Sequence, residues 1–312
     1  MNRSKYVDDR SIRSVTDGPL HIGNLRTALI AWLAARVTGG TMLLRIEDLD
    51  RSNSSRVNEK AQRTDLDTLG ITYESSVERQ SDRFEIYRSV IAELTKRDLV
   101  YPCYCSRREI REAVSAPQGN YAHVPYPGIC RTLSAADRRE REDSGRHPAL
   151  RLRTDGEVYT VNDRLAGESV LHTDDFVLER NDGVPSYNLA VVVDDELQGI
   201  DQVVRGDDLL SSTGRHIHLQ TLLGFRVPEF AHVPLVLGGD GERLAKRHGA
   251  VTLSDLASAG TSPREVLGVL AHSIGIDIEA PHDAADLLGD FSWDRVPRSA
   301  WTIPVPWQTV EQ

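Results

Sequence analysis

The sequence predicts an α/β fold built on a parallel sheet, and two adjacent segments predict it. Apolar side chains between Leu25 and Leu33 recur at helical spacing, and Gly39-Gly40 follows where such a helix would end. Residues 41–46 then form a short β-type run that leads into the acidic pair Glu47-Asp48. With a strand before the helix this is a βαβ unit, whose ligands bind at the carboxyl ends of the strands. We therefore expect a Rossmann-type fold with Glu47 at the ligand-binding edge.

Length and composition favour a soluble enzyme of the cytoplasm. The 312 residues are enough for one large domain or two modest ones, and 39% of them are hydrophobic. No run approaches the ~20 apolar residues of a membrane span, and no signal-peptide core follows the first residues. The 37 Lys and Arg residues face 47 Asp and Glu residues, for a net charge of −10. Nucleic-acid binding usually shows a basic footprint, so any such contact should be local.

Two glycine-containing segments, far apart in the chain, predict a nucleotide site. Residues 18–24 read Gly-Pro-Leu-His-Ile-Gly-Asn, so the first helix begins at or just after His21, and its N-terminus can hold a phosphate. His21 offers a ring N–H to a phosphate oxygen, and Gly23 lets a flat ring approach the backbone. Residues 238–249 form a glycine-bounded basic loop that can close over a triphosphate, where Lys246 would meet the charge that builds as pyrophosphate leaves. Either segment alone is a common turn pattern, whereas the pair is far more specific.

The pair resembles the His-Ile-Gly-His and Lys-Met-Ser-Lys-Ser signatures of class I aminoacyl-tRNA synthetases. Three further blocks, residues 43–50, 187–195 and 203–209, look like the catalytic domain of glutamyl-tRNA synthetases, and above all like its short relatives, the glutamyl-queuosine tRNA(Asp) synthetases. The similarity covers roughly residues 10 to 275. It implies a class I Rossmann catalytic domain that uses ATP and Mg²⁺.

The resemblance also implies roles for the residues of the two signatures. It makes His21 and Lys246 catalytic. Asn24 stands where the family has its second histidine and is a weaker donor, and Ala245 removes one hydroxyl. Arg243 keeps the positive charge where family members often have lysine, so closure over ATP is expected. The ATP-binding residues are then His21, Gly23, Asn24, Arg243 and Lys246.

Five residues supply what an acidic amino-acid substrate needs. Its α-carboxylate and side-chain carboxylate each need a cation, and its ammonium needs an anion; arginine suits carboxylates because its planar fork binds both oxygens. Residue types do not assign which arginine meets which carboxylate, and each residue alone is more often part of a surface ion pair. The resemblance places all five around glutamate: Arg10, Arg205 and Glu47 as charges, with Tyr187 and Ser14 as neutral partners.

Three cysteines grouped between positions 103 and 130 indicate thiol or metal chemistry, because their odd number argues against a disulfide framework. Zinc favours four tetrahedral ligands, so Cys103, Cys105 and Cys130 need one more donor. His123 is the ordinary choice by chemistry. The resemblance instead points to Tyr126, because the short synthetases carry Cys-x-Cys followed by Tyr-x-x-x-Cys. Three reduced structural cysteines without a metal are the alternative.

Changes of rhythm along the chain divide it into four parts. Residues 1–98 are expected to form the first half of the catalytic domain, and 99–149, which hold the cysteines and a Pro/Gly-rich stretch, a zinc-binding insertion. Residues 150–250 form the second half with the basic loop, and 251–312 a helical segment and a tail that packs on the rest. Five further helices are expected: one ends at Gly70, and the others start near an N-cap at Ser81, after Ser134, at a cap formed by 211–213 and at Pro263. Short strands are expected within 150–180, and further strands at 199–204 and 232–237. A hairpin turn is expected at 181–183, leading to 187–193.

The resemblance implies that glutamate and ATP give glutamyl-adenylate and pyrophosphate, and that glutamate then passes to a nucleic acid. Positioning and charge stabilisation would suffice for this chemistry, without a protein nucleophile. A full glutamyl-tRNA synthetase resembles this domain plus a large anticodon-binding region, whereas about 36 residues follow Ile276 here. This length favours the queuosine base in the anticodon of tRNA(Asp) as the acceptor, and a monomer is expected.

Two alternatives stay open. One is a truncated glutamyl-tRNA synthetase that charges a tRNA 3′ end. The other is a non-catalytic nucleotide- or RNA-binding paralogue. It is motivated by residues 10–18, where Arg10 and Ser14 fit the family but both family prolines are missing and one residue, assigned to Asp17, is extra. Without the fixed φ angles of proline the loop is less rigid, and the insertion could shift Arg10 relative to His21.

Overall fold

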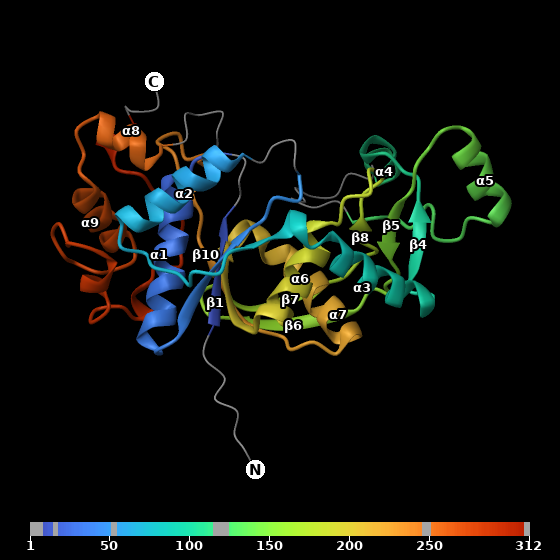
Figure 1. Cartoon of the computed structure of the whole chain (residues 1–312), viewed down its shortest axis with the longest axis horizontal. Coiled ribbons are helices and arrows are strands. Elements are labelled where there is room, and N and C mark those ends of the chain that lie inside the picture. The colour runs from blue at the N-terminus through green and yellow to red at the C-terminus, as the bar shows by residue number, and fades with distance from the viewer. Residues whose placement is uncertain (1–8, 15–17, 51–54, 115–124, 245–250, 309–312) are drawn as a thin grey trace, which may run out of the picture.

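The computed structural model describes residues 9–14, 18–50, 55–114, 125–244 and 251–308, and a five-stranded parallel sheet lies at its centre (Figure 1). The strand order is β10-β9-β1-β2-β3, so the first strand lies between strands of the two halves of the chain. This arrangement confirms the predicted α/β fold. The strands are β1 (Asp9–Ser14), β2 (Thr41–Ile46), β3 (Glu78–Arg79), β9 (Ile200–Gly206) and β10 (Glu229–Val233).

Helices cover both faces of this sheet. Helix α1 (Ile22–Val37) packs on β1, β2 and β9, and it is buried on nearly every side because the C-terminal elements cover its outer face. Helix α6 (Tyr187–Gln198) packs on β9, and α7 (Thr213–Leu223) packs on α6. Helix α7 also contacts the hairpin of β6 (Val158–Asp163) and β7 (Gly167–His172).

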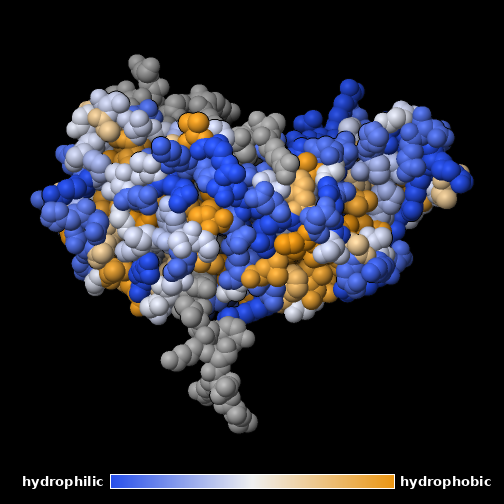
Figure 2. All heavy atoms as spheres, viewed as in Figure 1, coloured by the Kyte–Doolittle hydropathy of each residue, from blue (hydrophilic) through white to orange (hydrophobic). Residues whose placement is uncertain are grey.

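The insertion that contains the cysteines forms one end of the molecule, and the C-terminal helices lie at the opposite end (Figure 1). Its antiparallel sheet joins β4 (Val100–Cys103), β5 (Ala149–Leu152) and β8 (Val177–Glu179). The pairing of β4 with β5 crosses residue 149, and the division into domains stays a prediction. Two outer helices, α4 (Arg107–Ala113) and α5 (Ala135–Asp143), bury no residue, and Figure 2 shows this end as mostly hydrophilic.

The C-terminal part packs into the main core, as expected. Helices α8 (Leu253–Ser258) and α9 (Pro263–Ser273) bury Leu256 and Leu270 against the core that contains α1. Trp307 is also buried there. The segment beyond α9 holds four short pieces, which are η4 (Ala284–Leu287), η5 (Trp293–Arg295), β12 (Trp301–Thr302) and α10 (Val305–Gln308). Of these, β12 pairs in parallel with β11 (Val236–Leu237), which precedes α8 in the chain.

Several predicted boundaries are confirmed because a local capping signal sets them. His21 is the N-cap of α1, and Ser134 caps α5 through a capping box. Pro263 occupies the first turn of α9, and α2 (Arg56–Thr68) ends just before Gly70. Strand β9 begins at Ile200, one residue later than expected, because Gly199 is the left-handed cap of α6.

The turn at residues 181–183 is present, but it leads into a helix and not into a hairpin strand. Ser186 Oγ accepts the N–H of Leu189 at 3.3 Å and so caps α6, which contains the apolar run 187–193. Both sides of this run are buried, against the sheet and against α7, and such a run has no periodicity that separates strand from helix.

Three other predicted elements are wrong in detail. The strand at 232–237 is split into β10 and β11, because Pro234 has no N–H to donate. Ser81 is not a helix cap: it lies in a 3-10 turn, η1 (Gln80–Asp82), and donates to Asp48, while α3 (Phe84–Lys96) starts later. Ser212 ends another 3-10 turn, η2 (Asp207–Ser212), and its hydroxyl donates to a preceding carbonyl instead of capping α7.

None of the helices within the described ranges is both long and apolar enough to cross a bilayer.

Candidate functional site

A cavity of about 430 Å³ opens at the carboxyl ends of the central strands, and both halves of the chain line it. The N-terminus of α1 forms one wall and the end of β9 another. The segment that follows β10 closes it. Five of the residues predicted from the sequence line this cavity, namely His21, Gly23, Asn24, Arg205 and Arg243.

The first turn of α1 is closed by a reciprocal pair of hydrogen bonds. The N–H of Asn24 donates to His21 Nδ1 at 3.2 Å, and the N–H of His21 donates to Asn24 Oδ1 at 3.3 Å. In the neutral ring the proton then lies on Nε2, the nitrogen that can donate to a phosphate. Asn24 is therefore a helix-capping residue at the position where the family has histidine.

Gly23 is required for a reason that the sequence did not indicate. A Cβ at this position would lie 2.9 Å from a ring carbon of His21 and 3.4 Å from Cβ of Val236. Only glycine lets the imidazole fold back over the first turn of α1, which sets the direction of the ring.

The base of the basic loop lies at the rim of the cavity. A bridge between Leu237 and Arg243 closes the turn, and the guanidinium of Arg243 forms an ion pair with Asp208 at 2.8 Å. The Arg243 side chain is 57% exposed, so it can exchange this partner for a ligand. Asp208 was not among the residues predicted from the sequence. Ala245 and Lys246 lie outside the described residues.

Arg205 is buried at the floor of the site with all five of its N–H donors used. The side chain is 6% exposed. None of its five acceptors is a carboxylate, so within the described residues the guanidinium has only neutral hydrogen-bond partners. The acceptors are His232 Nε2 at 3.0 Å, His216 Nδ1 at 3.1 Å, Tyr187 Oη at 3.4 Å, Thr213 Oγ1 at 2.6 Å and the Leu209 carbonyl at 3.3 Å.

The two histidines can accept from Arg205 only because their other ring nitrogens are bonded elsewhere. His232 Nδ1 lies 2.5 Å from Asp163 Oδ2, and His216 Nε2 lies 2.9 Å from Asn188 Oδ1. Burial lowers the pKa of His232 below its ordinary value, although the Asp163 hydrogen bond opposes this shift. These residues could not be identified from the sequence, because a histidine in a buried strand or helix carries no local signal of its partner.

The structure describes two of the other residues predicted to bind glutamate, Tyr187 and Glu47, with their side chains. Tyr187 contacts Arg205, as described above. Glu47 follows β2, and its side chain is 4% exposed; it forms an ion pair with Arg45 at 3.3 Å and is not among the residues that line the cavity. In β1, Arg10 pairs with Met42 and Ser14 with Ile46, so Ser14 ends beside the residue that precedes Glu47. The side chains of Arg10 and Ser14 are outside what the structure describes.

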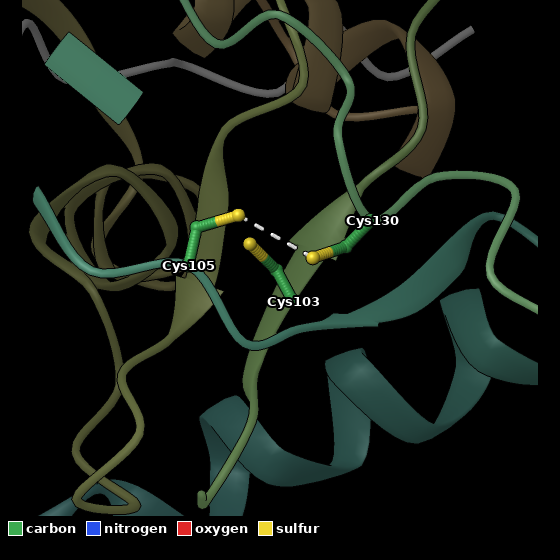
Figure 3. Close-up of side chains that lie close together, drawn as sticks. All are labelled: Cys103, Cys105 and Cys130. Atoms are coloured by element: carbon green, nitrogen blue, oxygen red, sulfur yellow. Dashed lines mark hydrogen bonds between the residues drawn. The ribbon is translucent and has the colours of Figure 1, made fainter. Parts of the chain in front are cut away.

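The three cysteines converge at the end of β4 (Figure 3). They are not disulfide-bonded, and their sulfur atoms all lie within 4.8 Å of one another, with 3.4 Å between Cys105 and Cys130. Tyr126 Oη lies 3.3 Å from the sulfur of Cys103 and 3.6 Å from that of Cys105. The pKa of Cys103 is lowered to about 4, and the hydrogen bond with Cys105 is the largest cause.

This donor set fits zinc. Four tetrahedral ligands with Zn–S bonds of about 2.3 Å place sulfur atoms about 3.8 Å apart, close to the separations here. The fourth donor at hand is the Tyr126 hydroxyl, which also accepts the N–H of Cys130 at 2.8 Å. His123, the other candidate, is not among the described residues.

The geometry and the sequence define the class of protein. The family described as tRNA synthetases class I (E and Q), catalytic domain, matches residues 15–289. The chain belongs to this family, and the resemblance inferred from the two signatures is confirmed.

Two curated relatives of the chain carry a narrower name. The chain is 51% identical over 286 residues to the glutamyl-Q tRNA(Asp) synthetase of Nocardia farcinica, covering 92% of this chain and 90% of that protein. It is 45% identical to the protein of the same name in Symbiobacterium thermophilum, covering 92% and 93%. The fold matches the crystal structure of a glutamate-tRNA synthetase from Elizabethkingia anophelis with a TM-score of 0.80 at 23% identity, over 98% of this chain and 70% of that one.

Proposed function

We propose that this chain is a ligase that activates L-glutamate with ATP and transfers the glutamyl group to the queuosine base in the anticodon of tRNA(Asp). The observation that carries the proposal is the cavity, which joins a helix N-terminus suited to phosphate with a buried arginine suited to a carboxylate. The relatives named glutamyl-Q tRNA(Asp) synthetase support this acceptor.

ATP occupies the side of the cavity next to α1. The first-turn N–H groups and His21 face its phosphates, and Gly23 keeps the His21 ring in place. Arg243 leaves Asp208 for the triphosphate, and Lys246 follows as the loop closes. Mg²⁺ accompanies ATP and offsets part of its charge.

Glutamate occupies the side next to Arg205. The neutral acceptors fix the guanidinium in space without cancelling its charge, so an incoming carboxylate is attracted to it and takes the place of one of these acceptors. Arg10 binds the second carboxylate, Glu47 the ammonium, and Ser14 and Tyr187 add hydrogen bonds. An acidic side chain is thereby favoured over its amide.

The chemistry needs two displacements. A glutamate carboxylate oxygen attacks the α-phosphorus of ATP in line, and pyrophosphate leaves with its charge met by His21 and Lys246. A hydroxyl of the queuosine base then attacks the acyl carbon of the adenylate, and AMP leaves. That base must be splayed from the anticodon stack to reach the cavity.

Zinc held by Cys103, Cys105, Tyr126 and Cys130 is structural in this proposal, because four protein ligands leave no open coordination position. The reduced cysteines fit the cytoplasm, where thiols stay reduced, and the protein acts there as a monomer.

Pyrophosphate exchange tests the activation step. Without RNA, labelled pyrophosphate should enter ATP when glutamate is present and not when aspartate or glutamine replaces it. Equal exchange with glutamine would show that the Arg205 assignment is wrong. No exchange with any amino acid would support a non-catalytic RNA-binding protein instead.

A further inference from the structure

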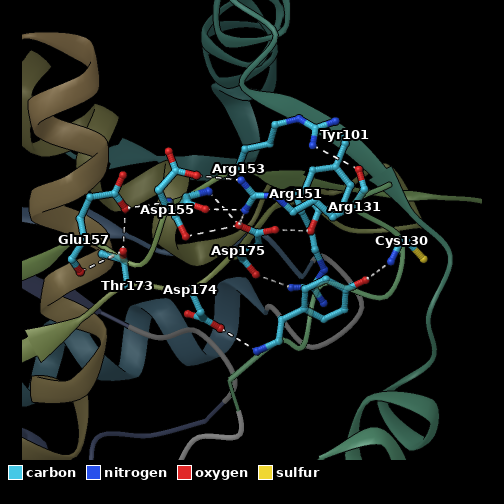
Figure 4. Close-up of polar contacts among 12 residues, drawn as sticks. Tyr101, Cys130, Arg131, Arg151, Arg153, Asp155, Glu157, Thr173, Asp174 and Asp175 are labelled. Atoms are coloured by element: carbon cyan, nitrogen blue, oxygen red, sulfur yellow. Dashed lines mark hydrogen bonds and ion pairs between the residues drawn. The ribbon is translucent and has the colours of Figure 1, made fainter. Parts of the chain in front are cut away.

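Two adjacent aspartates lie between β7 and β8, where the cysteine-containing insertion meets the catalytic half (Figure 4). Asp175 accepts the Tyr101 hydroxyl at 2.6 Å and the guanidinium of Arg131 at 2.8 Å. Tyr101 precedes Cys103 by two residues, and Arg131 directly follows Cys130. Asp175 therefore holds both chain segments that supply the thiols.

Asp174 holds the segment that supplies the fourth donor. Its Oδ2 accepts the backbone N–H of Tyr126 at 2.9 Å. Its Oδ1 accepts from Nε of Arg215 at 2.6 Å and also from the Nη2 of the same side chain. Only 14% of the Asp174 side chain and 11% of the Arg215 side chain are exposed, so this ion pair is shielded from water. One carboxylate thus links Tyr126 to α7.

Arg215 lies between the two α7 residues that hold Arg205. Thr213 and His216 accept from the guanidinium of Arg205, and Arg215 lies in the same first turn of the helix. This turn fits tightly on β7, since a Cβ at Gly214 would lie 3.1 Å from Cβ of Leu171. A displacement of the Arg215 backbone therefore displaces the acceptors of Arg205.

The aromatic ring of Tyr126 is restrained as well. The guanidinium of Arg151 lies 3.8 Å from its centroid and donates to the Asp175 carbonyl at 2.9 Å. The side chain and the backbone of Tyr126 are thus both tied to the Asp174-Asp175 pair. When Tyr126 is fixed as a metal ligand, the position of Asp174 is fixed with it.

We propose that metal binding at the cysteines and glutamate binding at Arg205 are coupled through Asp174 and Arg215, which act as positioning residues. The inference rests on the proposed function, which assigns zinc to one site and glutamate to the other. Coupling between two ligands is reciprocal, so each raises the affinity for the other by the same factor.

The test measures zinc affinity of the full-length protein by competition with a chromogenic chelator, with and without saturating glutamate and in the absence of ATP. Glutamate should tighten zinc binding in the wild type by about fivefold or more, the lower range of known couplings. Asp174→Ala should abolish this difference. Arg215→Lys keeps the charge but loses the bidentate contact with Asp174, so it should reduce this effect of glutamate on zinc affinity. The matched control is Asp155→Ala, which removes an exposed partner of Arg131 and should keep the full difference.

The outcomes separate this inference from the proposed function. Glutamate-dependent pyrophosphate exchange together with a zinc affinity that glutamate leaves unchanged overturns the coupling alone. A full glutamate effect in both Asp174→Ala and Arg215→Lys also overturns it. Absence of exchange in the wild type overturns the proposed function and the coupling with it.

Discussion

The Arg205 site and the cysteine centre satisfy their polar groups in opposite ways. Each donor of Arg205 already has a protein acceptor, and these acceptors come from β10, α6, α7 and the 3-10 turn η2. The thiols of the cysteine centre have mainly one another and one hydroxyl, which are weak partners. The first site is therefore built before its ligand arrives, whereas the second is completed by a metal ion. This difference predicts that changes at Arg205 lower activity strongly, whereas changes at the cysteine centre mainly lower stability.

Removal of the preformed charge should have the largest effect. Arg205→Ala should lower kcat/KM for glutamate in pyrophosphate exchange by about 10³-fold, as expected when one partner of a buried charged pair is lost. Arg205→Lys should recover only part of this, because lysine cannot reach the same five acceptors. Arg139→Ala, on the exposed surface of α5, is the control and should leave exchange unchanged. Near-normal activity of Arg205→Ala would remove the glutamate assignment.

Loss of a transition-state contact should come next. Lys246→Ala should lower kcat for exchange by ~100-fold or more, with a smaller change in the KM for glutamate. The effect belongs to pyrophosphate departure and not to amino-acid binding. Steady-state kinetics with each substrate varied in turn separates the two parameters, and a change confined to the KM for glutamate would contradict the assignment.

Loss of the metal should affect stability more than chemistry. The wild type should contain about one zinc per chain, and Cys103→Ser or Cys130→Ser should lose it and destabilise the insertion, because metal binding contributes directly to folding. The KM for glutamate should rise by about five- to tenfold, in the lower part of the range of known couplings between sites, while kcat changes little. Metal analysis of protein prepared without chelators measures the zinc content per chain. A wild type without zinc would contradict the zinc assignment.

Mild acid should have the smallest effect, and at the Arg205 site it acts through His232. Because burial lowers the pKa of His232, the folded protein keeps this ring neutral while the unfolded chain titrates near pH 6.5. Its contribution to stability is thus fully present above about pH 6.5 and is lost as the pH falls towards the lowered pKa, with a slope of at most about 1.4 kcal/mol per pH unit. Asp163, Arg205 and Asp207 are the charged groups that act on this ring.

The same protonation removes an acceptor of Arg205, so the KM for glutamate should rise over this pH range. His232→Gln, which keeps a neutral acceptor, should flatten the rise. His147→Gln, at an exposed position, should not. If the KM for glutamate rises by the same amount in His232→Gln, a group other than His232 causes the rise.

The sequence predicted those features that neighbouring residues determine. The start of α1 at His21, strand β2 and the cap of α5 each depend on residues within a few positions of one another. The grouping of the cysteines was likewise visible, because two of them are separated by one residue. Tyr126, which the family resemblance favoured over His123, has its hydroxyl next to two of the sulfur atoms.

The environment of Arg205 could not be predicted in this way. His216 and His232 lie 11 and 27 positions from Arg205, and Asp163 reaches His232 across 69 positions. The apolar run at the start of α6 was equally ambiguous, because a segment buried on both sides loses its helical periodicity. The role of Gly23 also needed coordinates, since its neighbour in space is the ring of His21.

The central claim is tested most directly by transfer of labelled glutamate to tRNA. The account predicts that tRNA(Asp) containing queuosine accepts the label, that the unmodified transcript does not, and that nuclease digestion recovers the label on the modified nucleoside. Efficient labelling of unmodified tRNA(Glu) at its 3′-terminal adenosine would contradict the account and support a glutamyl-tRNA synthetase instead.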